Sequence, residues 1–194
     1  MRRTILLPLL GTVALLVTLN ILNPDTGAEV VRSNESSSED SSRVPGDSLP
    51  IRLKIPALNL DTEIEYVGLT PDGKMDTPKD ITKVAWYEEG AMPGEEGSAV
   101  IAGHYGWTGG KASAFDKLHT LKEGDTIYVE DEAGDIVSFT VSHIRNYSPE
   151  DDAADVFTST DKEAHLNLIT CAGEWNRDTE SYAERLIIFS TRTK

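Results

Sequence analysis

Cys171 is the residue of this chain best suited to covalent chemistry, and it is the only cysteine among the 194 residues. A single cysteine cannot form an internal disulfide. The thiolate is the nucleophilic form of cysteine, and it needs a base or a cation nearby because a free thiol ionises only near about pH 8.5. The competing interpretation is a small buried hydrophobic residue, which is the more frequent role of an unpaired cysteine.

His104 has the sequence context expected of a catalytic base. It follows the apolar segment 99–103 and precedes a glycine-rich loop over residues 106–110, so we predict that it lies at the end of a strand. The other histidines lie inside a predicted strand, before a strand, or in a polar stretch after a helix: His143, His165 and His119. These three contexts are less suited to catalysis.

An enzyme that forms a thioester also needs a group that stabilises the developing oxyanion. Arg185 begins a predicted strand next to the cysteine strand and fits this role. Arg177, six positions after Cys171, is the competitor, and we expect it on a mobile loop. Spacing alone does not decide between the two arginines.

Alternating residues predict the strands that must position these groups. In residues 166–171, Leu166, Leu168 and Thr170 share one face, and Cys171 falls on the opposite face at the end of the strand. We expect Ala172-Gly173 to break this strand, and we expect the last strand to cover residues 185–191.

The rest of the folded region also has mainly period-two patterns. Strands are predicted over residues 51–55, 62–67, 98–104, 126–130 and 136–147, and short helices over residues 113–118 and 149–157. Turn signals occur at residues 70–73 and 131–135. Many short strands with little helix predict an all-β fold, a closed or nearly closed barrel.

The N-terminal region has a different character. Residues 5–22 carry no charge and would span about 27 Å as a helix, close to the thickness of a bilayer core. We therefore expect residues 1–22 to form a membrane anchor, with an uncleaved or cleaved signal peptide as the alternative. Residues 23–49 read as a disordered acidic and Ser-rich linker, and residues 50–194 as the folded domain, outside the cell by the positive-inside rule.

Charge and ligand spacing exclude several functions. The net charge of -15 argues against nucleic acid as a partner, because phosphate binding needs clustered Lys and Arg. The sequence contains no metal-ligand spacing, so we expect no metal and no cofactor.

Together, these features resemble the sortase family, the cysteine transpeptidases of Gram-positive-type cell surfaces. Leu168-Ile169-Thr170-Cys171 is similar to the family's Leu-x-Thr-Cys signature, and Ala102-Gly103-His104 is similar to its histidine segment. The strand 185–189 is similar to its arginine strand, and the stretch 86–104 looks most like the class E/F branch, with class D second.

The resemblance implies a closed barrel of about eight strands with one or two short helices, behind an N-terminal transmembrane helix. It implies that Cys171 is the nucleophile, His104 the general acid/base and Arg185 the oxyanion or substrate-positioning group, and that Thr170 helps to orient substrate. The implied reaction cleaves an LPXTG-like sorting signal between Thr and Gly and transfers the protein to an amine acceptor. The implied partners are secreted proteins with sorting signals and a cell-wall precursor or pilin lysine, at the cell membrane.

Three other readings remain open from the residues alone. The domain could be a non-catalytic surface binding module with a buried Cys171, which would not react with thiol reagents. An L,D-transpeptidase would also use Cys and His, but its Ser-x-Gly-Cys-like segment is absent. A simple cysteine protease would hydrolyse its substrate even when an amine is added.

Overall fold

The computed structural model describes residues 48–178 and 180–194. The predicted membrane anchor and nearly all of the predicted linker lie outside these residues. Within the described part of the chain, no helix combines the length and the apolar character needed to cross a bilayer.

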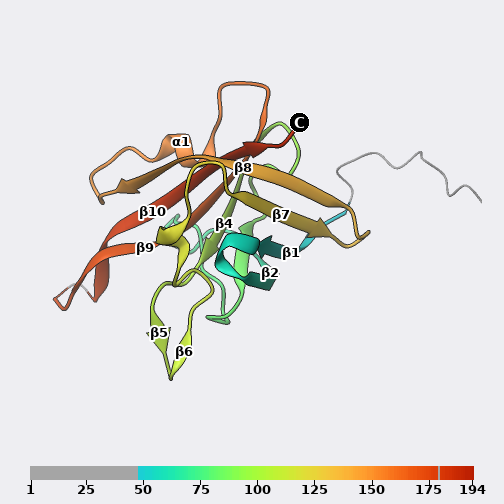
Figure 1. Cartoon of the computed structure of the whole chain (residues 1–194). Coiled ribbons are helices and arrows are strands. Elements are labelled where there is room, and N and C mark those ends of the chain that lie inside the picture. The colour runs from blue at the N-terminus through green and yellow to red at the C-terminus, as the bar shows by residue number, and fades with distance from the viewer. Residues whose placement is uncertain (1–47, 179) are drawn as a thin grey trace, which may run out of the picture. The chain divides into compact units, whose positions relative to one another are not determined.

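Eight strands form a closed barrel in the order β1-β2-β3-β4-β9-β10-β8-β7 (Figure 1). Their bounds are β1 Pro50–Ile55, β2 Leu60–Val67, β3 Val84–Tyr87, β4 Gly97–Gly103, β7 Thr126–Asp131, β8 Ile136–Tyr147, β9 Ala164–Asn176 and β10 Ser181–Arg192. A separate two-stranded hairpin, β5 (Trp107–Thr108) and β6 (Lys111–Ala112), follows β4. The prediction of an all-β barrel is confirmed.

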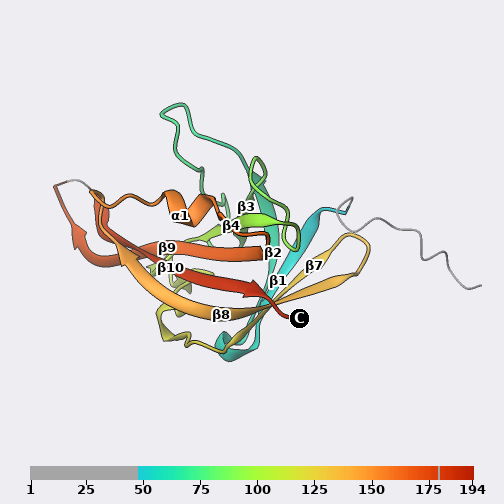
Figure 2. The same ribbon diagram turned by 90° about the horizontal axis from the view of Figure 1, so that it is seen from above.

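Two parallel pairs interrupt an otherwise antiparallel barrel. β2 pairs with β3 in parallel, and β4 pairs with β9 in parallel, whereas β1 closes the barrel by pairing antiparallel with β7. Figure 2 shows β4, β9, β10 and β8 side by side. The parallel β4–β9 pair brings residues separated by a long stretch of sequence to the same end of the sheet.

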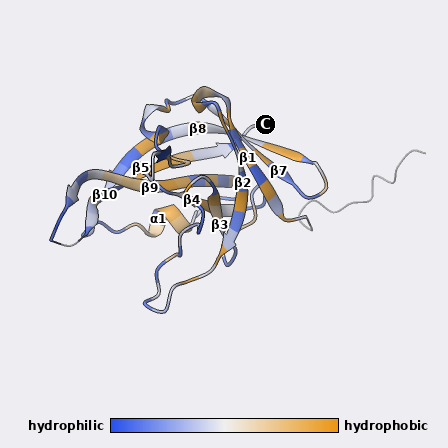
Figure 3. Cartoon of the chain, turned by 90° about the horizontal axis from the view of Figure 1, so that it is seen from below, coloured by the Kyte–Doolittle hydropathy of each residue, from blue (hydrophilic) through white to orange (hydrophobic). Residues whose placement is uncertain are grey.

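The core follows from the alternation of side chains along each strand. On β9, Leu166 and Leu168 point into the barrel, and Phe115 and Phe139 help to fill it; all four are 0% exposed. Figure 3 shows polar and apolar residues alternating along the strands. Burying one such aromatic or aliphatic side chain stabilises the fold by about 1.5–3 kcal/mol.

A second apolar cluster, here called the outer cluster, lies on the outside of the barrel. It contains Val100 of β4, Ile187 and Phe189 of β10, Tyr147 of β8 and Val156. Val156 belongs to the short helix α1 (Ala154–Phe157), which lies in the connection between β8 and β9. α1 therefore covers part of the outer face of β4, β9 and β10.

The predicted end of the cysteine strand is wrong. β9 continues past Cys171 to Asn176, and β10 begins at Ser181 rather than at Arg185. Gly173 has a φ of 76° and lies where the β9–β10 register shifts, so it forms a bulge within the strand instead of ending it. Pairing with β10 outweighs the local tendency of glycine to break a strand.

The smaller elements also differ from expectation. The predicted helix over residues 113–118 is a turn that leads into a 3-10 helix, η2 (Leu118–Thr120), and a second 3-10 helix, η1 (Pro56–Leu58), follows β1. β3 and the β5–β6 hairpin were not predicted. β3 is only four residues long and three of them are buried, so it shows no alternation.

Candidate active site

Strand pairing places Cys171 beside Arg185, and His104 directly follows the end of the adjacent strand β4. Cys171 on β9 and Arg185 on β10 are directly opposite partners in the antiparallel ladder. On the other side of β9, the parallel register with β4 ends with Ala102 opposite Ile169. β4 itself ends at Gly103, and the hydrogen bond from Thr170 to the carbonyl of Gly103 brings this end of β4 to the residue before Cys171.

Cys171 and Arg185 both point to the outer face of the sheet. Cys171 has the same parity as Ile169, which packs against the outer cluster, and Arg185 has the same parity as Ile187. His104 lies beyond the end of β4, so its orientation does not follow from strand alternation. Directly opposite residues of an antiparallel pair have Cβ atoms about 4.5–5.5 Å apart, so a guanidinium and a thiol in this arrangement can act on one carbonyl group.

Cys171 is half-buried and forms no disulfide. The competing interpretation, a fully buried hydrophobic residue, therefore does not hold. The neighbouring Thr170 is 3% exposed, faces the barrel interior, and donates a hydrogen bond from Oγ1 to the carbonyl of Gly103 at 2.7 Å. This bond joins β9 to β4 one residue before the nucleophile and one residue before His104. Thr170 thus aligns the two strands, and a direct contact with substrate stays a prediction.

The backbone of His104 is fixed by close packing. A Cβ added at Gly103 would lie 2.5 Å from Cδ2 of Phe115, so only glycine permits this approach. The N–H of Phe115 donates to the carbonyl of His104 at 3.0 Å. The end of β4 is therefore held against a fully buried aromatic ring.

The imidazole of His104 is half-buried and is held by a carbonyl group. Nε2 lies 2.8 Å from the carbonyl oxygen of Pro78. A carbonyl oxygen only accepts hydrogen bonds, so Nε2 carries the proton. Nδ1 is then the unprotonated nitrogen of the neutral ring.

Arg185 is exposed, and its Nη1 donates to the backbone carbonyls of Glu184 at 2.9 Å and Tyr182 at 3.2 Å. These bonds turn the guanidinium along its own strand and leave other N–H groups for an anionic oxygen. Arg177 lies in the turn after β9, roughly 20 Å along the chain from Cys171. The structure brings Arg185 to the cysteine and does not bring Arg177.

The remaining histidines have other contacts. His143 on β8 stacks on Phe189 with ring centroids 4.2 Å apart, and His165 is paired with Asp161 at 2.7 Å. His119 lies edge-on to Tyr105, 6.4 Å between ring centroids. None of the three faces Cys171 across a strand pair.

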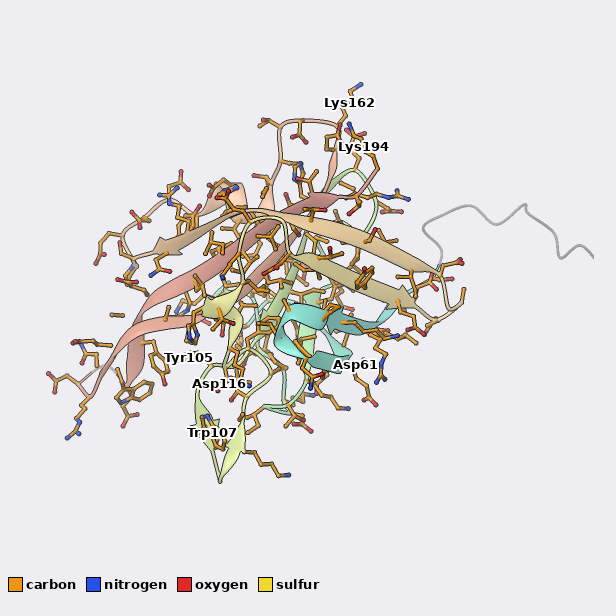
Figure 4. All side chains as sticks on the ribbon, in the orientation of Figure 1. Asp61, Tyr105, Trp107, Asp116, Lys162 and Lys194 are labelled. Carbon is orange, nitrogen blue, oxygen red and sulfur yellow. The ribbon has the colours of Figure 1, made fainter. Side chains whose placement is uncertain are left out.

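The loop after His104 makes aromatic contacts that the sequence analysis did not predict. Tyr105 packs edge-on against Tyr182, which in turn packs against Trp175 on β9. Trp107, on the β5–β6 hairpin, donates from Nε1 to Asp116 at 3.1 Å (Figure 4). Tyr105, Tyr182 and Trp175 thus form one aromatic cluster that links the loop after His104 to β9 and β10.

α1 is fastened beside the site by two hydrogen bonds. Asn167 donates from Nδ2 to the carbonyl of Val156, and the hydroxyl of Tyr147 donates to Oδ2 of Asp155, both at 2.7 Å. Burial, followed by the adjacent Asp155 carboxylate, raises the pKa of Tyr147 to about 12. A polar pocket of about 570 Å³, lined in part by Asn167, His143 and Phe189, lies further along the same face.

The described side chains form no candidate metal site. Residues 48–178 and 180–194 contain no group of three or more His, Cys, Asp or Glu side chains that could hold a metal ion.

The sequence reasoning missed the segment that holds His104. Pro78 is 26 residues before His104 and contributes only a backbone carbonyl. Nothing in the residue type marks such a contact.

Comparison with known proteins gives both family and fold matches. A family model described as Sortase domain matches residues 53–193. Sortase C1 from Streptococcus agalactiae superposes with a TM-score of 0.58 at 24% identity, covering 74% of this chain and 67% of that chain. Sortase C-1 from Actinomyces oris gives 0.57 at 25% identity over 75% of each chain, and sortase C from Clostridium perfringens gives 0.54 at 23% over 75% and 70%. No curated protein matches the chain significantly.

These matches identify the family and leave the branch open, so the class E/F assignment stays a prediction. The family match runs from β1 to the residue after β10 and includes His104, Cys171 and Arg185. Because it covers most of the sequence, the chain belongs to the sortase family.

Proposed function

We propose that this sortase cleaves an LPXTG-like sorting signal between Thr and Gly and transfers the acyl group to an amine acceptor at the cell surface. The observation that carries the proposal is the placement of Cys171 opposite Arg185, with His104 directly after the end of the neighbouring strand β4. A nucleophile, an acid/base and a cation are the groups that acyl transfer needs.

In the first half-reaction, the thiolate of Cys171 attacks the carbonyl carbon of the Thr residue, and a C–S bond forms. The guanidinium of Arg185 stabilises the negative charge on the carbonyl oxygen. The C–N bond then breaks as the imidazolium of His104 donates its Nδ1 proton to the departing Gly amine. The product is a thioester between the substrate and the enzyme.

In the second half-reaction, an acceptor amine attacks the thioester carbonyl. The amine loses a proton to Nδ1 of the now neutral His104, the C–S bond breaks, and the thiolate is restored. A thioester remains reactive toward amines, which favours transfer when an amine is bound nearby. Without an amine, water takes its place and the products are those of hydrolysis.

The outer face offers a surface for the apolar part of the signal. Ile169 lies two residues from Cys171 along β9 and is only partly buried, whereas Ile187 is 1% exposed and lies within the outer cluster. We expect an extended peptide leading to the scissile bond to contact Ile169 beside α1. The proposal also includes membrane anchoring through residues 1–22, with the catalytic domain outside the cell.

Mass spectrometry of the purified domain with sorting peptides and amines tests this function. We expect amine-dependent ligation by the wild-type domain, no turnover by Cys171→Ala, and at least about a 100-fold lower rate for His104→Ala. An acyl-enzyme adduct should form only when Cys171 is present. Turnover by Cys171→Ala would refute the assignment, and products unchanged by added amine would indicate a protease instead.

A further inference from the structure

A single peptide group connects His104 to a carboxylate. The carbonyl oxygen of Pro78 accepts the Nε2 proton of His104 at 2.8 Å, and the next N–H, that of Lys79, donates to Oε2 of Glu65 at 2.8 Å. This C=O and this N–H belong to the same planar peptide unit, and in a trans unit they point in opposite directions. The imidazole and the Glu65 carboxylate therefore bind opposite ends of one rigid group.

We propose that Glu65 is a positioning residue for His104, acting through the Pro78–Lys79 peptide group to fix the tautomer and orientation of the imidazole. This inference rests on the proposed role of His104 as the acid/base. Nucleophile–base pairs in enzymes commonly have a third group that orients the base. Within residues 48–178 and 180–194, no carboxylate makes a hydrogen bond to His104 directly, so the orienting group must act through an intermediary.

The carboxylate of Glu65 binds two consecutive peptide groups, Pro78–Lys79 and Lys79–Asp80. Its Oε2 accepts from Lys79, and its Oε1 accepts from the N–H of Asp80 at 3.3 Å. Rotating the Pro78–Lys79 plane would break the shorter bond and disturb the longer one. Glu65 itself is held on β2, where it is half-buried and paired with Ala85 of β3.

The carboxylate also acts electrostatically along this chain of hydrogen bonds. A charged acceptor strengthens the bond to Lys79, and hydrogen-bonded groups in series polarise one another. The carbonyl of Pro78 becomes a better acceptor, which favours a proton on Nε2 in both the neutral and the cationic imidazole. Nδ1 is then kept for proton transfer to the leaving amine.

Glu63 provides a matched control on the same strand. It lies two residues from Glu65, on the same face, and its carboxylate is 2.6 Å from Nζ of Lys83. In the described part of the chain, it makes no hydrogen bond to Pro78, Lys79 or Asp80. Replacing Glu63 therefore removes the same charge from the same strand without releasing the peptide group.

The test compares two substrates with the same acyl peptide. One has the natural amide, whose amine must be protonated as it leaves; the other is a thioester, whose thiol leaves without a proton. Both are attacked by the same thiolate, so the ratio of their acylation rates cancels any change in the ionisation of Cys171. Acylation is measured in single-turnover reactions by mass spectrometry of the full domain.

For Glu65→Ala we expect the amide-to-thioester rate ratio to fall at least about 10-fold. For Glu65→Gln we expect a smaller fall, because one acceptor oxygen remains. For the control Glu63→Ala we expect a ratio within about twofold of wild type. NMR of domain labelled with ¹⁵N-histidine gives a second readout: His104 should be the Nε2–H tautomer in the wild type and gain Nδ1–H population in Glu65→Ala. An unchanged ratio together with an unchanged tautomer, or an equal fall for Glu63→Ala, would overturn the proposal.

Two outcomes separate this inference from the proposed function. If the wild-type domain acylates neither substrate, the proposed function fails, and the tautomer measurement still decides whether Glu65 controls His104. If Glu65→Ala does not fold, Glu65→Gln carries the test, and a wild-type ratio and tautomer in that variant would show that the charge on Glu65 has no role.

Discussion

Replacing Gly103 by alanine tests how closely the catalytic histidine depends on packing behind it. The new methyl group would lie 2.5 Å from Cδ2 and 2.7 Å from Cγ of Phe115. Non-bonded carbon atoms approach to about 3.5 Å, so the strand and the ring must separate by about 1 Å. Phe115 is 0% exposed in the barrel core, so its ring can move only by displacing other core side chains.

The expected cost follows from this displacement. Adding a methylene-sized group to a well-packed core costs about 1–3 kcal/mol, so we expect Gly103→Ala to lower the free energy of unfolding by about 2 kcal/mol. His104 is the next residue, and its carbonyl is bonded to the N–H of Phe115. A shift of about 1 Å at a catalytic group can lower the rate about 100-fold, and we expect kcat/KM to fall by that order.

Urea unfolding and peptide-ligation kinetics measure the two effects. Phe115→Ala removes all three clashing ring atoms, so the double variant Gly103→Ala/Phe115→Ala should be more stable than the sum of the single changes by at least about 1 kcal/mol. Gly68→Ala is the control, since its added Cβ would meet only the flexible carboxylates of Glu89 at 3.2 Å and Glu88 at 3.9 Å. Unchanged stability in Gly103→Ala, or strictly additive single changes, would refute the packing argument.

Two further predictions concern the arginine and the helix beside the site. Arg185→Ala should lower kcat/KM at least about 100-fold, as expected for loss of an oxyanion-stabilising group. In the control Arg177→Ala, kcat/KM should stay within about threefold of wild type. Equal losses in the two variants would contradict a role for Arg185 based on its placement opposite Cys171. The pKa of Tyr147 is raised to about 12 in the folded state, against about 10 in the unfolded state. The unfolded state therefore loses this proton first as the pH rises, and the free energy of unfolding should fall between about pH 10 and 12. Urea unfolding from pH 8 to 12 should show this fall in the wild type and a smaller one in Tyr147→Phe; equal falls would show that Tyr147 is not the titrating group.

Much of the barrel was predictable because most strands alternate between core and outer residues. The predicted faces of β9 and β10 agree with the structure: Leu166 and Leu168 point inward, whereas Ile169 and Ile187 point outward. Period two fixes the face of each residue as soon as one face is buried. The rule put Cys171 on the face opposite Leu166 and Leu168, and this face is the outer one in the structure.

The failures of prediction share a physical cause. Ala172-Gly173 was expected to end β9, because glycine weakens a strand locally, but pairing with β10 carries the strand through Gly173 as a bulge. β3 was missed because burial of Val84, Ala85 and Trp86 removes the alternation that marks a strand. In each case the deciding interaction is tertiary and has no local signal.

The sequence predicts the positions of two of the site residues and not the position of the third. Cys171 and Arg185 lie within strands, so the hydrogen-bond ladder holds their backbones and their positions follow from register. His104 lies one residue beyond the end of β4, where the ladder no longer holds it. Its position depends on contacts from outside the sheet, and these involve backbone groups and a glycine rather than recognisable side-chain motifs.

The different contacts that hold His104 and the Cys171–Arg185 pair predict different effects of mutations away from the reacting groups. Three separate contacts hold His104: the Phe115 N–H on its carbonyl, the Pro78 carbonyl on its imidazole, and the missing Cβ of Gly103. Changes that disturb them displace only the acid/base and should reduce acylation of an amide more than that of a thioester. Changes in the β9–β10 pairing move Cys171 and Arg185 together, and should reduce the acylation of both substrates alike.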